Sequence, residues 1–173
     1  MQKAIITGTL AIGLAAIASF AAGGAKMKIT SSAFQEGANI PSKFTCDGSD
    51  ANPALRFEQI PAEAKSLVLI VDDPDAPSGL FTHWLAWNID PKITEVAENS
   101  APSNAVQGRN DFSKSGYGGP CPPSGTHRYF FKIFALDQVL DLKAGAKRAE
   151  VDAAMRGHVI GQGELMGRYS RNK

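Results

Sequence analysis

The sequence has almost no net charge and very little cysteine, and both shortages restrict what the protein does. Its 173 residues include 18 basic and 17 acidic side chains, which gives a formal net charge of +1. This balance argues against long-range attraction of nucleic acid, so any anion site must be local. The two cysteines, Cys46 and Cys121, form either one bridge, if the protein is exported, or two independent buried thiols.

An apolar run extends from Ala4 to Phe20 near the N-terminus. This run is short for a membrane-spanning helix. Lys3 precedes the run, and small residues follow it from Ala21 to Ala25. This order is typical of a secretory signal peptide. We therefore expect residues 1–21 to be a signal peptide, with cleavage sites up to residue 25 as alternatives, and a periplasmic or secreted mature protein. An uncleaved N-terminal anchor is the competing interpretation.

The remaining chain lacks repeats, heptads and low-complexity tracts, and its length suits one domain. Frequent turn-forming residues separate short apolar runs, which favours strands. The spacing predicts strands at Leu67–Val71, Phe81–Ile89 and Tyr129–Leu136, weaker strands at Ala105–Gln107 and Glu164–Tyr169, and one amphipathic helix at Lys147–Ile160. Many short strands with one helix predict a mainly β fold, a β-sandwich with a peripheral C-terminal helix.

Two segments carry residues suited to chemistry near the middle of the chain. Asp72–Pro77 follows the most apolar strand, and its prolines fix the directions of Asp73 and Asp75. His83 lies inside the next predicted strand. Each segment also has a plain structural interpretation: a proline turn with solvated acids, and a hydrogen-bonded core histidine.

A third segment, Gly116–Tyr129, is rich in glycine and proline. Glycines let the backbone approach a ligand and can aim successive N–H groups at an anion, while prolines stiffen the loop. His127 and Tyr129 alternate with Arg128, so they share one face of the strand that begins there. A stiff structural loop without a ligand is the alternative.

These segments together resemble the phosphatidylethanolamine-binding protein family, in its bacterial Raf-kinase-inhibitor-like branch. The motifs that carry the resemblance are Asp-Pro-Asp-Ala-Pro at 73–77, the His83–Trp84 pair, Gln-Gly-Arg-Asn-Asp-Phe at 107–112, Gly-Pro-Cys-Pro-Pro at 119–123 and Pro-Pro-x-Gly-x-His-Arg-Tyr at 122–129. The resemblance extends over residues 28–171, which we take as one domain. It implies a two-sheet antiparallel β-sandwich, with a large sheet packed on a smaller one and a ligand pocket at one edge.

By motif position, the resemblance implies which residues bind the ligand: Asp73, Asp75, His83, Pro123, His127 and Tyr129. The implied ligand is a phosphate-like anion or a phospholipid head group, and a kinase-inhibitor-like effect on a partner protein is a further implication. We expect neither catalysis nor a cofactor, and exposed aromatic side chains leave pairing of two copies open. In the resembled fold, the loops of Cys46 and Cys121 both border the pocket, so we expect a disulfide between them.

The physical chemistry of these residues fits an anion site, because imidazoles donate to anions and neighbouring carboxylates fix their tautomers. Two other chemistries use the same residues. Two histidines and two carboxylates suit zinc, and Cys121 with His127 as base would make a Cys-His hydrolase. A disulfide at Cys121 would remove that nucleophile.

Overall fold

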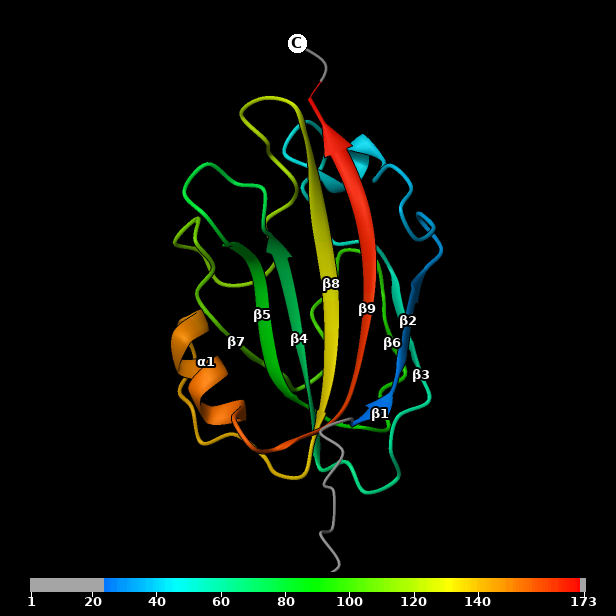
Figure 1. The fold of residues 1–173 in the computed structure, drawn as a ribbon, viewed down its shortest axis with the longest axis vertical. Coiled ribbons are helices and arrows are strands. Elements are labelled where there is room, and N and C mark those ends of the chain that lie inside the picture. The colour runs from blue at the N-terminus through cyan, green and yellow to red at the C-terminus, as the bar shows by residue number, and fades with distance from the viewer. Residues whose placement is uncertain (1–23, 172–173) are drawn as a thin grey trace, which may run out of the picture.

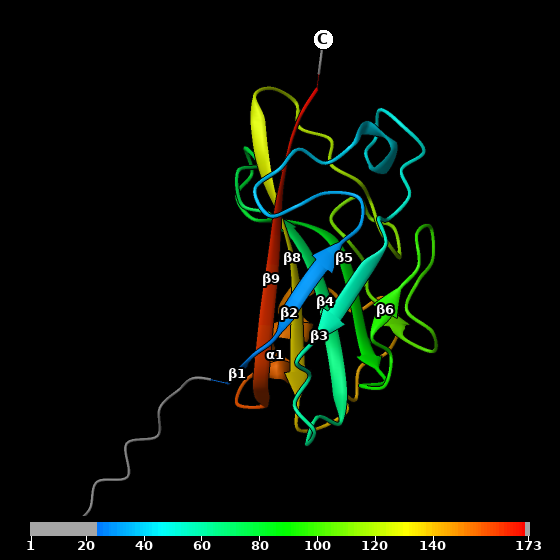
Figure 2. The ribbon, with the colours of Figure 1, turned by 90° about the vertical axis from the view of Figure 1, so that its right-hand side faces the viewer.

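Within residues 24–171, two β-sheets, one of six strands and one of three, pack face to face (Figures 1 and 2). The computed structural model describes residues 24–171, so the expected signal peptide and most of its alternative cleavage sites lie outside the described residues. None of the helices within that range is both long and apolar enough to cross a membrane.

The larger sheet has the order β1-β9-β8-β4-β5-β7, and every neighbouring pair is antiparallel except β1 with β9. Its strands are β1 (Ala25–Lys26), β9 (Val159–Ser170), β8 (Thr126–Leu136), β4 (Ser66–Asp73), β5 (Phe81–Ile89) and β7 (Val106–Gln107). The smaller, antiparallel sheet contains β2 (Lys28–Ser31), β3 (Leu55–Glu58) and β6 (Glu95–Val96), and a 3₁₀ turn η1 spans Ser42–Phe44. The mainly β, two-sheet sandwich is therefore confirmed.

Strand β4 lies in the middle of the molecule and is buried on both faces. Leu67, Leu69 and Val71 belong to the core between the sheets, whereas Val68 and Ile70 belong to a second core on the opposite face. Helix α1 (Arg148–Met155) lies beside the larger sheet (Figure 1), and its buried side chains Val151 and Met155 belong to that second core. This double burial explains why the strand has an unbroken apolar run rather than an alternating pattern.

The predicted helix at Lys147–Ile160 was too long, because the structure ends it at Met155. Gly157 has a φ of +82°, which an α-helix does not allow, and β9 begins at Val159. The apolar spacing continues beyond the helix because Val159 and Ile160 belong to the following strand, β9.

The predicted strand at Glu164–Tyr169 covers only half of the twelve-residue β9. Glycines at 161, 163 and 167 weakened its signal. A Cβ at Gly163 would lie 2.6 Å from the carbonyl oxygen of Met27, and one at Gly167 would lie 2.5 Å from Cγ1 of Ile40. Glycine is therefore required at positions 163 and 167, because other chain segments pass too close to the strand to leave room for a side chain.

Three adjacent strands bring the predicted site residues to one end of the sandwich, at the top of Figure 1. β4 ends there at Asp73, β5 begins at Phe81 and β8 begins at Thr126. β4 is paired with both neighbours, with Asp73 opposite Phe81 and Asp72 opposite Phe130, and β8 extends beyond this point to Thr126. The loops that join them enclose the candidate site.

Candidate functional site

A cavity of about 240 Å³ opens at this end of the sandwich. The residues that line it are Asp73, Ala76, Pro77, Ser78, Phe81, His83, Phe112, Cys121, Pro122, Pro123 and His127. Asp73, His83 and His127 are at most 7% exposed, whereas Phe112 is 38% exposed and Pro123 is also at the surface. The titratable groups therefore lie deep in the cavity, and apolar side chains surround its mouth.

Asp73 and His127 form a buried pair. Oδ2 of Asp73 lies 2.7 Å from Nδ1 of His127, and Oδ1 of Asp73 accepts a hydrogen bond of 2.8 Å from the backbone N–H of Asp75. An ionised carboxylate only accepts hydrogen bonds, so Nδ1 of His127 carries the hydrogen. Nε2 of His127 is left without a hydrogen-bond partner among residues 24–171 and is the ring nitrogen available to a ligand.

His83 is held in the same tautomer by the glycine-rich loop. Its Nδ1 lies 2.7 Å from the carbonyl oxygen of Gly118, which only accepts, so Nδ1 is again the donor. Burial lowers the pKa of His83, and the bond to Gly118 and the charge of Asp73 oppose that shift only in part. His83 therefore favours the neutral imidazole, with a lone pair on Nε2.

Tyr129 packs edge-on against the ring of His83, with 5.2 Å between ring centroids. It is fully buried and does not line the cavity surface, and its hydroxyl has no hydrogen-bond partner within the described range. Burial, followed by the negative charge of Asp73, raises the pKa of Tyr129. The phenol therefore stays protonated and keeps one unused O–H donor beside the site.

Asp75 does not line the cavity, in contrast to the other acid of the motif. Its carboxylate is bound to Arg128, with 2.8 Å to Nε and 2.6 Å to one terminal nitrogen. The hydrogen bonds from Arg128 lower the pKa of Asp75 to about 2. Asp75 faces a neighbouring shallow depression that Arg168 also lines, and it ties the β4–β5 turn to the start of β8.

The sequence suggested that the glycine N–H groups could point at an anion, but those of Gly118 and Gly119 are bound within the protein. Gly118 donates to the carbonyl oxygen of His83 at 3.0 Å, and Gly119 donates to Oδ1 of Asp50 at 2.7 Å. A Cβ at Gly118 would lie 2.6 Å from the ring of Phe112. These two glycines therefore allow close packing that fixes His83, rather than an anion nest.

The expected disulfide between Cys46 and Cys121 is present and closes a loop with a sequence separation of 75 residues. The backbone N–H of Cys46 also donates to the carbonyl of Pro120 at 3.1 Å. Cys121 lines the cavity, but a sulfur within a disulfide is not a thiolate nucleophile. The Cys-His hydrolase chemistry would therefore require prior reduction.

No group of three or more histidine, cysteine or acidic side chains within residues 24–171 has the geometry to hold a metal ion. Asp73 and His127 instead bind each other. Sequence reasoning missed the apolar walls of the cavity, above all Phe81 and Phe112. Phe112 ends the 107–112 motif, so its place in that motif was an available signal.

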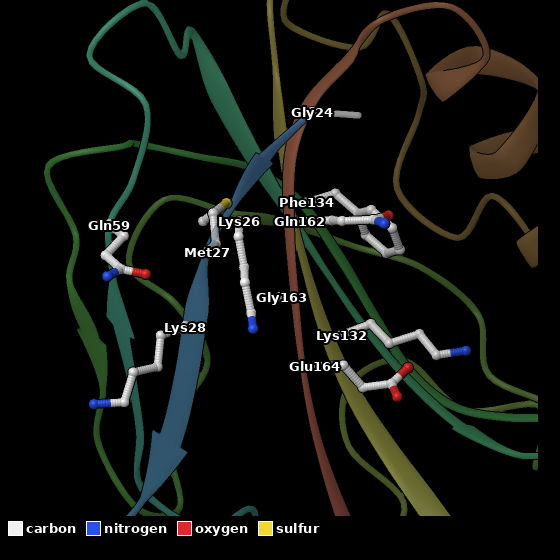
Figure 3. A pocket seen from close by; sticks show the side chains of 10 residues that line it. All are labelled: Gly24, Lys26, Met27, Lys28, Gln59, Lys132, Phe134, Gln162, Gly163 and Glu164. Carbon is white, nitrogen blue, oxygen red and sulfur yellow. The ribbon is translucent and has the colours of Figure 1, made fainter. Parts of the chain in front are cut away.

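A larger and more open depression, of about 900 Å³, lies around β1 and the middle of β9 (Figure 3). Its polar side chains do not converge: Lys28 and Gln59 lie on one side of β2, and Lys132 and Glu164 lie on the other. Lys28 is bound to Glu58, and Lys132 to Asp72. The smaller cavity, where three buried titratable groups meet, is the better candidate for a binding site.

Comparison with known proteins gives consistent matches across most of the chain. The sequence profile described as phosphatidylethanolamine-binding protein matches residues 30–170. A UPF0098 protein of Pyrococcus abyssi is 52% identical over 157 residues, which cover 86% of this chain and 88% of the relative. A UPF0098 protein of Aquifex aeolicus is 47% identical over 160 residues, covering 88% and 94%.

Two crystal structures show the same fold. A phosphatidylethanolamine-binding protein homologue, CT736 of Chlamydia trachomatis, superposes with a TM-score of 0.81 at 44% identity and covers 85% of this chain and 99% of its own. YbcL of E. coli, described as a member of the mammalian PEBP family, superposes with a TM-score of 0.80 at 30% identity and covers 86% and 100%.

Proposed function

Because the chain belongs to the phosphatidylethanolamine-binding protein family, we propose that its cavity binds a small oxyanion, either phosphate or the phosphorylated head group of a lipid. The buried pair of Asp73 and His127 is the observation that carries this proposal. When His127 is protonated, its Nε2–H donates to an oxyanion while its charge lies between the ligand and Asp73. The pair therefore supplies a donor without leaving an unbalanced positive charge inside the protein.

The size and walls of the cavity support a small ligand. Its volume of about 240 Å³ is below the roughly 300–1,000 Å³ that is typical of sites for drug-sized ligands. A phosphoryl group fits the polar interior, and the apolar side chains at the mouth suit a short carbon substituent. Phe112 at the mouth, and Leu80, which is 53% exposed and precedes the lining residue Phe81 in the chain, present apolar surface that a partner protein would contact. A modulating, kinase-inhibitor-like role would use this surface.

Titration calorimetry with inorganic phosphate at pH 6 tests the proposal. His127→Ala removes a charge-assisted hydrogen bond, worth about 1.5–3 kcal/mol, and should weaken binding roughly ten- to hundredfold. His83→Ala should also weaken binding, because His83 faces the same cavity.

His158→Ala is the matched control, because His158 also contacts an aspartate, Asp137, but lies exposed outside the cavity. Its affinity should equal that of the wild type. Unchanged affinity in both cavity variants would place the anion site elsewhere. One tightly held metal ion per chain, found by elemental analysis of the native protein, would favour a metal site instead.

A further inference from the structure

The two histidines of the cavity present a specific hydrogen-bonding pattern. Nδ1 of His83 donates to the carbonyl of Gly118, and Nδ1 of His127 donates to Asp73. Each neutral ring therefore has only a lone pair left, on Nε2. A cavity with two neutral imidazoles offers two acceptors, whereas a fully ionised oxyanion needs donors.

The surroundings distinguish the two rings. His127 directly contacts the carboxylate of Asp73, which balances a positive charge on the ring. His83 has no such contact: its fixed partner is a neutral carbonyl, and the rings of Phe81, Phe112 and Tyr129 surround it. The structure thus combines one ring whose positive charge a bound carboxylate would balance with one ring whose partner is a neutral carbonyl.

From this pairing we propose that the cavity selects oxyanions that carry their own hydroxyl group, namely phosphomonoesters and inorganic phosphate, over phosphodiesters. The anionic oxygen of such a ligand accepts from Nε2–H of His127, and its hydroxyl donates to Nε2 of His83. A phosphodiester has no hydroxyl, so its oxygen would face the lone pair of His83 unless that ring also took up a proton. This inference rests on the proposed anion-binding function and specifies its ligand class.

The charged groups around His83 do not remove the difference between its surroundings and those of His127. Asp73 and Asp72 lie on β4, and their negative charges favour a protonated His83. Asp72, however, is bound to Lys132 and Arg148 on the other face of the sheet, and Asp73 is bound to His127. Tyr129, from β8, is a neutral donor. Burial of His83 therefore remains the dominant influence.

Calorimetry with two small probes tests the selectivity on the intact mature protein. At pH 6.5 we expect methyl phosphate to bind more tightly than dimethyl phosphate, by about tenfold or more, since the diester would leave a buried polar group without a hydrogen-bond partner. At pH 8 methyl phosphate is mainly a dianion, because its second pKa is about 6. Its binding should then take up roughly one proton or more, measured by repeating the titration in buffers of different ionisation enthalpy.

The outcomes separate this inference from the proposed function. Equal affinity for the two esters, or no proton uptake at pH 8, would refute the selectivity and leave oxyanion binding standing. Failure of both esters and of inorganic phosphate to bind would refute the proposed function itself.

A substitution provides a second, independent test. His83→Gln replaces Nε2, which only accepts in the neutral ring, with an amide that both donates and accepts. The preference for methyl over dimethyl phosphate should fall at least threefold in this variant. His158→Gln, on the exposed histidine, should keep the wild-type preference, and a melting curve shows whether each variant is folded. An unchanged preference in folded His83→Gln would contradict the role of His83 as the acceptor for the ligand hydroxyl. If that variant does not fold, the proton-uptake measurement on the wild type remains the test.

The phosphomonoester has either a soluble or a lipid source. Competition against bound methyl phosphate by glycerol 3-phosphate, and separately by vesicles containing phosphatidic acid, distinguishes them. Displacement by glycerol 3-phosphate alone assigns a soluble ligand, and displacement by the vesicles assigns a lipid monoester. Displacement by neither would exclude both of these larger monoesters as ligands and leave inorganic phosphate as the ligand of the site.

Discussion

Oδ2 of Asp73 and Nδ1 of His127 lie 2.7 Å apart, although 54 residues separate them in the sequence. Asp73 is the last residue of β4, and His127 is the second residue of β8, its antiparallel neighbour. The pairing of these strands, which joins Asp72 to Phe130, brings the two side chains together. The sheet thus orients the imidazole before any ligand binds.

We expect Asp73→Asn to weaken phosphate binding about tenfold at pH 7. The amide can still accept from Nδ1 of His127, but it lacks the negative charge that would balance a positive charge on the ring. Calorimetry measures the loss. Asp137→Asn is the control, since it changes the exposed pair with His158 in the same way; an equal loss there would show that the effect is not specific to the cavity.

Reduction of the Cys46–Cys121 disulfide should lower both stability and affinity. A loop of this length gives a chain-entropy contribution of about 4–5 kcal/mol, so the melting temperature should fall by about 10 °C or more. Phosphate affinity should fall as well, because the bond holds one wall of the cavity. Calorimetric scans with and without reductant measure the first effect, and titrations measure the second.

The control for this experiment is the double variant Cys46→Ala/Cys121→Ala, which should show the reduced melting temperature and no further response to reductant. Thiol counting on denatured, unreduced protein should give zero free thiols. Two titratable thiols would contradict the bridge and restore Cys121 as a candidate nucleophile.

The lowered pKa of His83 predicts how stability depends on pH. Burial disfavours its charged form in the folded state, so the unfolded chain binds more protons between the lowered value and the ordinary value of 6.5. This contribution to the free energy of unfolding is complete above pH 6.5 and is lost as the pH falls through the lowered pKa. Denaturant unfolding in phosphate-free buffer should therefore show lower stability at pH 5 than at pH 7.

His83→Gln should flatten this part of the pH profile, because glutamine does not titrate. His158→Gln should leave the profile unchanged. An identical slope in wild type and His83→Gln would assign the pH dependence to other groups.

We propose that the protein is exported and that its mature N-terminus lies between Ala22 and Met27. Cleavage after Ala21 would leave β1 intact, where Ala25 pairs with Gly161 and Lys26 with Gln162, whereas cleavage after Ala25 would remove half of that strand. N-terminal sequencing of the exported protein distinguishes these sites. A membrane-bound form that retains Met1 would contradict cleavage.

The sequence by itself determined the fold class and most of the strands that form the site. Leu67–Val71 and Phe81–Ile89 were recognisable because local side-chain patterns report burial and strand alternation. The motifs also identified Asp73, His83, Pro123 and His127, all of which line one cavity. Their role in binding stays a prediction.

Only the tertiary structure decided which groups are free to meet a ligand. Asp73 and Asp75 share one motif, yet Asp73 binds His127 inside the cavity and Asp75 binds Arg128 outside it. The glycine N–H groups were equally ambiguous until their partners across the loop were known. Hydrogen-bond partners and burial come from contacts between segments distant in the chain, and local sequence patterns carry no record of those contacts.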